Sequence, residues 1–153
     1  MMRFYSIGAH LLSFVTCRMP LTIEWAHCDP AGIVFNPRFF EFFDTGTWHL
    51  FEAVLGVPRQ RLMKAHGIWS IPLVDAGADF RIPLAFGDAA ELETTIGEFR
   101  RSSFDVIHRI FKGDKVAIEG KETRVWAGQD PANPERIRAV PVPEAVIAKF
   151  KRA

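Results

Sequence analysis

The stretch His27-Cys28-Asp29-Pro30-Ala31-Gly32-Ile33-Val34-Phe35-Asn36-Pro37 runs directly into the Phe-rich segment Arg38-Phe39-Phe40-Glu41-Phe42-Phe43-Asp44. The second segment begins a predicted helix, 37–55, because Asn36 can cap it and Pro37 fits its first turn. Gly56 and Pro58 mark its end. Apolar positions extend well beyond one stripe of this helix, so we expect other elements to enclose it.

The same stretch places a lone carboxylate, Asp29, beside the N-terminus of the helix. An aspartate there can act as nucleophile or general base, while unpaired N–H groups of the first turn can stabilise a developing negative charge. Acyl transfer needs these parts. An ordinary turn is the alternative interpretation, since Asp, Pro and Gly are common turn residues, and spacing alone favours it.

Length and composition predict a single domain, 1–153, with residues 1–13 as an N-terminal extension rather than a signal peptide. Nineteen basic residues balance 18 acidic ones, which argues against a dedicated nucleic-acid binder. The two cysteines form no C-x-x-C pair, so a disulfide framework and a structural zinc site are not expected. Because no apolar stretch approaches ~20 residues, we expect a soluble, cytoplasmic protein.

The rest of the chain predicts an α+β fold. An alternating segment, 21–27, predicts a strand that His27 ends. Short links predict that the strands after the helix form a sequential antiparallel meander. These later strands lie at about 69–82, 89–101, 103–112 and 115–127, followed by a loop at 129–135 and a short helix at 143–152. The expected architecture is a five-stranded antiparallel sheet wrapped around one central helix, whose free edges favour dimer formation.

The residues next to Asp29 are further site candidates. His27 lies two positions away and can share a face with Asp29, so it could bond the carboxylate or a substrate group, or simply end the strand. Cys28 points away from His27 in an extended chain and is expected to be a buried cysteine. No second cluster at ligand spacing follows, so no metal site is predicted.

Two more candidates lie further along the chain. Asp44 falls beside the polar edge of the helix, with aromatic neighbours. Arg100, Arg101, Ser102 and Ser103 occupy a predicted hairpin tip, where guanidinium groups and hydroxyls could bind phosphate oxygens. A solvated basic turn is the alternative for this tip.

With these residues in place, the chain resembles the 4-hydroxybenzoyl-CoA thioesterase family of hotdog-fold proteins over about Thr16 to Ile147. The most specific segment is Cys28-Asp29-Pro30-Ala31-Gly32-Ile33-Val34. The supporting matches are Asp44, Glu98-Phe99-Arg100-Arg101 before Ser103-Phe104, and Ile137-Arg138-Ala139-Val140.

The resemblance implies a hotdog fold in which two subunits join their sheets, often within a tetramer, and form the acyl-CoA site at their interface. It implies that Asp29 attacks the thioester carbonyl or activates water, and that the backbone N–H of Asn36 polarises the carbonyl oxygen. Neither a metal nor a redox cofactor is implied.

The resemblance also implies that Asp44 receives the ring hydroxyl of a hydroxybenzoyl group, with His27, Ile71 and Pro72 as further substrate-binding residues. Arg100, Arg101, Ser102 and Ser103 would face the nucleotide phosphates of CoA. The chain departs from the family pattern at Ser102, where a lysine is usual, and at Ile71, where a small polar residue is usual. The Trp that follows the helix in hydroxybenzoyl-type members has no counterpart near Arg59.

The expected function is hydrolysis of an aromatic, 4-hydroxybenzoyl-like CoA thioester. Three alternatives stay open. The chain could hydrolyse short or branched aliphatic acyl-CoA, or bind acyl-CoA or an acyl carrier without catalysis. A hotdog dehydratase is the third, although such enzymes usually pair a His with an acidic residue on a hydroxyacyl chain.

Overall fold

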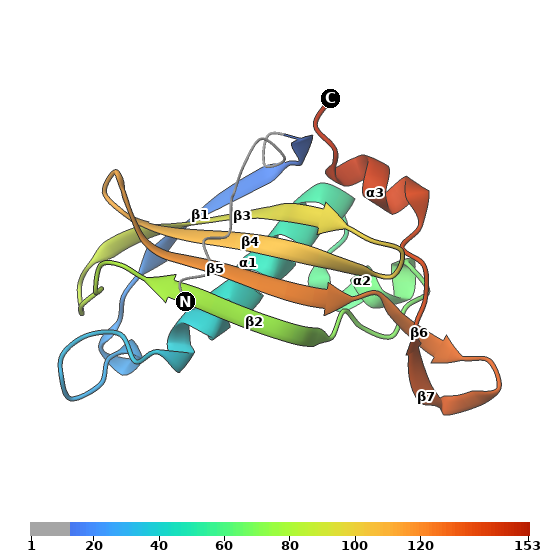
Figure 1. The fold of residues 1–153 in the computed structure, drawn as a ribbon, viewed down its shortest axis with the longest axis horizontal. Helices are drawn as coiled ribbons and strands as arrows, with labels where there is room; N and C mark the ends of the chain where they lie inside the picture. The colour runs from blue at the N-terminus through green and yellow to red at the C-terminus, as the bar shows by residue number, and fades with distance from the viewer. Residues whose placement is uncertain (1–12) are drawn as a thin grey trace, which may run out of the picture.

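A five-stranded antiparallel sheet packs against the long helix α1 (Pro37–Leu55) (Figure 1). The structure is a computed structural model and describes residues 13–153. The strands lie in the order β1 (Thr16–Thr22), β3 (Ala89–Phe99), β4 (Ser103–Lys112), β5 (Lys115–Val125) and β2 (Leu73–Phe80). This confirms the predicted α+β architecture and the predicted bounds of the helix.

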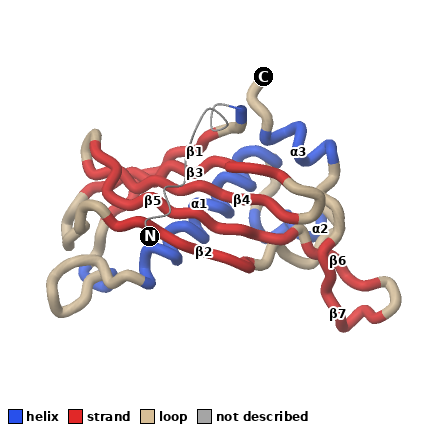
Figure 2. Tube along the Cα trace, in the orientation of Figure 1, coloured by secondary structure: helices blue, strands red, loops and turns tan. Residues whose placement is uncertain are grey.

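The remaining elements are short and lie at the ends of the sheet (Figure 2). They are the 3-10 turn η2 (Trp25–His27), α2 (Arg59–Ala65), the strands β6 (Ala127–Asp130) and β7 (Asn133–Ala139), and α3 (Glu144–Phe150). The β6–β7 hairpin projects from the body beyond the ends of β5 and β2 (Figure 1). No helix in the described part of the chain is long and apolar enough to cross a membrane.

Helix α1 is enclosed because aromatic side chains cover so much of its surface. Phe39, Phe43 and Phe51 are all buried. The sheet approaches the helix closely at Gly120, where an added Cβ would overlap the ring of Phe43. Helix α1 ends at Gly56, whose φ of 67° is the left-handed conformation that favours glycine.

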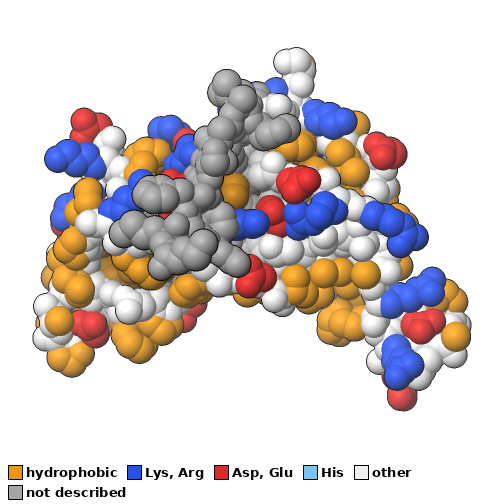
Figure 3. Space-filling view, viewed as in Figure 1, with side chains coloured by type: hydrophobic (Ala, Val, Ile, Leu, Met, Phe, Trp, Pro, Cys, Tyr) orange, Lys and Arg blue, Asp and Glu red, His pale blue; other side chains and the backbone are white. Residues whose placement is uncertain are grey.

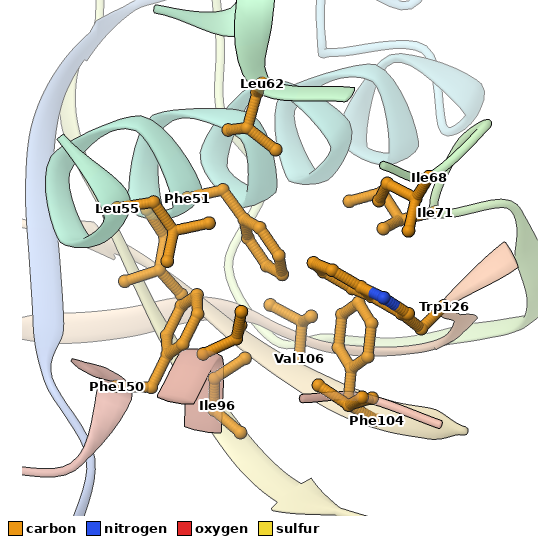
Figure 4. Packing of buried hydrophobic residues seen from close by; sticks show 13 residues of the cluster. Phe51, Leu55, Leu62, Ile68, Ile71, Ile96, Phe104, Val106, Trp126 and Phe150 are labelled. Atoms are coloured by element: carbon orange, nitrogen blue, oxygen red, sulfur yellow. The ribbon is translucent and has the colours of Figure 1, made fainter. Parts of the chain in front are cut away.

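A hydrophobic core fills the space between α1, the sheet and α3 (Figure 4). Phe51 from α1 meets Phe104 from β4 and Phe150 from α3, with ring centroids 5.4 and 4.8 Å away. Trp126, just after β5, closes one side of this core and is 1 % exposed. Burial of each such side chain stabilises the fold by roughly 1.5–3 kcal/mol. The terminal helix is therefore part of the core.

The predicted sequential meander is wrong for β2. Strands β3, β4 and β5 do form a meander, but β2 pairs antiparallel with β5 instead of β3. Residues 81–88 cross the end of the sheet, bonding Arg81 N–H to Ala117 and Gly87 N–H to Ile23. This crossing link buries Leu84 and carries the chain from one sheet edge to the other side. β2 therefore becomes an edge strand.

Two local predictions are also wrong. Only the first two residues of the strand predicted at 21–27 are in a strand, because β1 ends at Thr22. Residues 25–27 form η2 instead, where Glu24 N–H bonds the ring Nδ1 of His27 at 2.9 Å and closes a turn. Segment 129–135 is not a plain loop, because β6 and β7 pair across it, and β7 is an exposed edge on which Pro134 is tolerated.

The predicted N-terminal extension, 1–13, lies almost entirely outside the described residues. Where the description begins, Phe14 bridges to Lys151, and Val15 N–H bonds the carbonyl of Phe150. The start of the described chain is thereby tied to its C-terminal helix.

Candidate active site

Asp29 lies in a tight loop between η2 and α1. Its Oδ1 accepts the N–H of Ala31 at 2.8 Å, and its carbonyl accepts the N–H of Gly32 at 2.9 Å. Gly32 has a φ of 80°, which lets the loop turn back toward α1. Among the described residues, no donor reaches the second carboxylate oxygen, Oδ2. The loop thus fixes the carboxylate and leaves one oxygen for chemistry.

Asn36 stands at the start of α1, but its side chain does not cap the helix, contrary to the sequence prediction. Its backbone is already helical, so the side chain does not fold back over the first turn. Within residues 13–153 the N–H of Asn36 donates to no acceptor, whereas the N–H groups of Arg38 and Phe39 are paired. This unpaired N–H is a donor for a developing negative charge.

His27 has a structural contact in this region. Its Nδ1 accepts the N–H of Glu24 at 2.9 Å, and its ring lies edge-on to Phe42 at 5.0 Å. A neutral ring that accepts at Nδ1 carries its proton on Nε2, so Nε2 is the atom left to donate. Cys28 is half-buried and its thiol lies 3.7 Å from the carbonyl of Glu24.

Asp44 opens into a cavity of about 700 Å³ between α1 and the start of β2. Phe40, Trp48, Ile71 and Pro72 line it with Asp44. Phe40 and Trp48, two predicted aromatic neighbours of Asp44, therefore share one cavity with the predicted residues Ile71 and Pro72. The third predicted aromatic neighbour, Phe51, lies in the hydrophobic core instead. Neither Asp29 nor Asn36 borders this cavity.

Arg124 holds Asp44 in place from inside the protein. Its Nη2 bonds Asp44 Oδ1 at 2.8 Å and Glu122 Oε1 at 3.1 Å, while Nη1 reaches the carbonyl of Ile71 at 3.3 Å. The side chains of Arg124 and Glu122 are only 5 % and 1 % exposed. One buried guanidinium thus links the helix wall and the strand wall of the cavity.

A polar chain continues from Glu122 into the core. His108 is fully buried, with Nε2 3.2 Å from Glu122 Oε2 and Nδ1 3.0 Å from the hydroxyl of Thr94. Thr47 donates to the same Glu122 oxygen at 2.8 Å. Phe43 stacks on the imidazole with ring centroids 4.7 Å apart. A neutral ring with its proton on Nε2 satisfies every one of these contacts.

Burial and hydrogen bonding shift the pKa values of His108 and Glu122 in this polar network. Burial lowers the pKa of His108 from its usual 6.5, and this outweighs the opposing attraction of Glu122. Burial alone would raise the pKa of Glu122, but hydrogen bonds from His108 and Arg124 outweigh it and lower that pKa from 4.5 to about 2. The folded protein therefore holds Glu122 ionised and His108 neutral at neutral pH.

These shifts predict acid lability. Both groups bind fewer protons in the folded than in the unfolded state, so the free energy of unfolding falls as pH falls. We expect the loss to begin near pH 6.5, through His108, and to deepen between pH 4.5 and about 2, through Glu122. Urea unfolding at a series of pH values measures the free energy of unfolding. Glu122→Gln is expected to remove most of its decrease between pH 4.5 and about 2. A profile that is level from pH 7 to 3 would contradict it.

The predicted basic turn is mostly engaged with the protein itself. Arg100 bonds Asp105 Oδ1 at 2.6 Å, Glu98 at 3.0 Å and the hydroxyl of Ser103 at 3.0 Å. Ser102 accepts the N–H of Trp126 on its carbonyl. Arg101 is exposed, and its guanidinium has no partner among the described residues. Arg101 is therefore the residue of this turn with a free cation.

A second, smaller groove of about 170 Å³ lies beside the start of α1. Ile33 and Asn36 border it on one side and Phe80 and Arg81 on the other. It adjoins the loop of Asp29, because Asp29 N–H bonds the carbonyl of Ile33 at 3.0 Å. In a single chain, the Asp29–Asn36 region and the Asp44 cavity are thus separate.

The sequence prediction missed His108, Glu122 and Arg124, and also Arg59, which borders the Asp44 cavity. A signal for two of them was present: Glu122 and Arg124 occupy alternate positions with Ile118 and Gly120, on the face of β5 that the helix covers. Polar residues on an apolar face call for buried partners. Within residues 13–153, no cluster of His, Cys, Asp and Glu could hold a metal ion.

Comparison with known proteins agrees with this architecture. The family model of the thioesterase-like superfamily matches residues 23–150. The chain is 33% identical over 130 residues to a 4-hydroxybenzoyl-CoA thioesterase from Pseudomonas sp. (strain CBS-3), covering 82% of this chain and 90% of that protein.

Solved structures give the same result. The structure of the 4-hydroxybenzoyl CoA thioesterase from Pseudomonas sp. strain CBS-3 superposes with a TM-score of 0.77 at 31% identity, over 88% of this chain and 98% of that one. A variant of 4-hydroxybenzoyl CoA thioesterase in complex with 4-hydroxybenzoyl CoA matches equally well, at 30% identity. A gentisyl-coenzyme A thioesterase matches with a TM-score of 0.73 at 30% identity, over 86% and 99% of the two chains.

The helix-centred sheet is thus the hotdog fold, and the relatives act on CoA thioesters. The chain belongs to the thioesterase-like superfamily, as an acyl-CoA thioesterase of the hotdog fold.

Proposed function

We propose that this thioesterase hydrolyses an aromatic, 4-hydroxybenzoyl-like CoA thioester to the free acid and CoA. The observation that carries the proposal is the Asp44 carboxylate, which Arg124 holds at the wall of an aromatic-lined cavity of about 700 Å³. In the single chain Asp44 is 42% exposed, and its Oδ2 has only a 3.5 Å contact to Arg59. An acyl group that covers this carboxylate displaces water from it, so the cavity favours an acyl group that brings a hydroxyl to Asp44. The relatives that act on 4-hydroxybenzoyl and gentisyl thioesters support this substrate class.

We assign the chemistry to Asp29 and Asn36. The carboxylate of Asp29 either takes a proton from water as the water adds to the thioester carbonyl, or adds to that carbonyl itself to form an anhydride that water then opens. In both routes the N–H of Asn36 stabilises the carbonyl oxygen as it gains negative charge. Collapse of the tetrahedral intermediate breaks the C–S bond, which gives the free acid in the first route and the anhydride in the second. The CoA sulfur leaves in this step as thiolate and takes up a proton.

The basic turn is proposed to bind the phosphates of CoA. Arg101 supplies the free guanidinium, while Asp105 fixes Arg100 beside it with its side chain 38% exposed. The hydroxyls of Ser102 and Ser103 lie in the same turn. CoA is part of the substrate, and the proposal needs no cofactor. The free cysteines Cys17 and Cys28 fit a reducing cytoplasm, where we place the reaction.

We further propose that two copies of the chain pair along β2, the edge strand of the sheet. No residue of this strand is buried, and Leu73, Val74 and Phe80 on it are large exposed apolar residues. Figure 3 shows hydrophobic side chains along the edge at which β2 lies. An unpaired apolar edge strand is a template for pairing with another chain.

Such pairing would complete the site. Leu73 borders the Asp44 cavity and Phe80 borders the groove beside Asn36, at opposite ends of β2. A twofold axis through antiparallel β2 strands places the Leu73 end of one copy next to the Phe80 end of the other. The Asn36 groove of one copy then faces the Asp44 cavity of its partner. A tetramer would be a pair of such dimers, and sedimentation velocity distinguishes the two states.

A shared site predicts complementation between two inactive variants. Asp29→Asn and Asp44→Asn chains are each expected to be poor catalysts on the 4-hydroxybenzoyl thioester. In a mixed dimer, one site carries both substitutions and the other carries neither, so co-expression is expected to restore about a quarter of the wild-type rate. Thiol release from the co-purified chains measures it. A mixture no more active than its components would place each site within one chain.

The experiment that tests the proposed function is thiol release from a panel of CoA thioesters. The panel contains 4-hydroxybenzoyl, benzoyl, and short, branched and long aliphatic acyl groups. We expect the highest kcat/KM for 4-hydroxybenzoyl. Preference for an aliphatic chain would move the assignment to an aliphatic thioesterase, and saturable binding without thiol release would indicate a binding module. Hydration of an enoyl thioester would indicate a dehydratase.

A further inference from the structure

Arg59, the first residue of α2, reaches the Asp44 cavity from outside the core. Its guanidinium carbon lies 4.6 Å from the ring centroid of Trp48, and its Nη2 lies 3.5 Å from Asp44 Oδ2. The side chain is 49% exposed. The contact with the Trp48 ring holds the guanidinium beside the Asp44 carboxylate at the cavity.

The two oxygens of Asp44 differ in how firmly they are held. Oδ1 bonds the buried Arg124 at 2.8 Å. Oδ2 has only the exposed Arg59, at 3.5 Å, which is longer than an ordinary N–H···O bond of about 2.7–3.2 Å. The Arg124 contact therefore fixes the carboxylate, while the Arg59 contact can open at little cost.

We propose that Arg59 determines specificity by forming, with Asp44, a paired donor and acceptor for one hydroxyl group of the acyl chain. The hydroxyl enters between the two side chains, donates its O–H to Asp44 Oδ2 and accepts an N–H from Arg59. This inference rests on the proposed function, since it names the group that the cavity recognises. A carboxylate cannot donate a hydrogen bond to the hydroxyl oxygen, and Arg59 supplies that donor.

The arrangement makes a chemical distinction among substituents on the ring. A hydroxyl both donates and accepts, so it satisfies both residues. A methoxy group only accepts, and therefore bonds Arg59 and leaves Asp44 without a donor. An amino group mainly donates, and therefore bonds Asp44 alone. An unsubstituted ring satisfies neither, so we expect hydroxyl to be preferred over all three.

The test compares CoA thioesters of benzoate carrying hydroxyl, methoxy, amino or hydrogen at the distal position. The variants are Arg59→Met, which keeps an unbranched apolar stem without the donors, and Arg59→Lys, which keeps a charged donor group. Arg61→Met is the matched control, because Arg61 is exposed on the same short helix. For each protein, kcat/KM gives the preference for each substituent over hydrogen. Kd for the corresponding non-hydrolysable CoA thioethers gives the same preference without turnover.

Arg59→Met is expected to lower the hydroxyl and methoxy preferences roughly 10-fold or more, and to leave the amino preference unchanged. Arg59→Lys is expected to recover part of the loss, and Arg61→Met to match the wild type. Equal preferences in Arg59→Met and wild type, or a uniform loss on all four compounds, would overturn the inference. Absent thiol release with an intact preference in Kd would instead overturn the proposed function.

Discussion

Asp29→Asn is expected to lower kcat on the preferred thioester by about 10²- to 10⁴-fold while the fold stays intact. The amide cannot take a proton from water or add to the carbonyl carbon, so both proposed routes lose their reacting atom. The loop itself is expected to survive, because the amide oxygen of asparagine can still accept the N–H of Ala31, as Asp29 Oδ1 does now. The loss should therefore fall on kcat and not on thermal stability.

Asp130, in the β6–β7 hairpin, provides a matched control for Asp29→Asn. Asp130 makes the same kind of turn, with Oδ1 accepting the N–H of Ala132 at 2.9 Å, far along the chain from Asp29. Asp130→Asn changes charge and turn chemistry equally but touches neither cavity. It is expected to keep wild-type turnover. An Asp29→Asn enzyme as active as Asp130→Asn would remove Asp29 from the mechanism.

Much of the fold could be predicted because its signals are local. Pro37 and Gly56 bound helix α1, and the turns after Phe99 and Lys112 join strands that are neighbours in the sequence and in the sheet. The position of Asp44 at the polar edge of that helix follows from the same periodicity. Each of these features depends on residues that lie within a few positions of one another.

The pairing of β2 could not be predicted in the same way. A short link after a strand favours the neighbouring strand, but residues 81–88 form long-range bonds to Ala117 and Ile23 that steer the chain past it. The turn at Glu24 and His27 shows the opposite case, in which one local side-chain bond overrides an alternating pattern. Long-range bonds and single side-chain contacts leave no periodic signal.

The candidate site was likewise predicted only in part. The roles proposed for Asp29 and Asn36 follow from their local context, and the place of Asp44 on the helix follows from its periodicity. Arg124 gains its role only because β5 lies under α1, which brings its guanidinium to Asp44 from 80 positions away in the sequence. The same guanidinium also bonds the carbonyl of Ile71, so Arg124 joins two walls of the cavity.

Arg124→Met is the substitution expected to cost the most stability. Methionine fills much of the same volume, but it leaves Glu122 buried with His108 and Thr47 as its remaining partners. Breaking a buried ion pair from one side costs about 3–5 kcal/mol, so we expect a loss of that size in the free energy of unfolding in urea. Arg109→Met is the matched control. Arg109 lies on β4 and pairs loosely, at 3.5 and 3.6 Å, with Glu93 and Glu119, so its loss should cost less than about 1 kcal/mol.

A double variant separates the charge from the packing. If the cost of Arg124→Met comes from the stranded carboxylate, Glu122→Gln in the same chain is expected to recover part of it, because a neutral amide is cheaper to bury unpaired. The released Asp44 should still lower the preference for 4-hydroxybenzoyl over benzoyl in both variants, since its Oδ1 has lost the bond from Arg124. A single variant no less stable than Arg109→Met would show that the buried pair contributes nothing. Unchanged substrate preference would show that Asp44 is held by the helix alone.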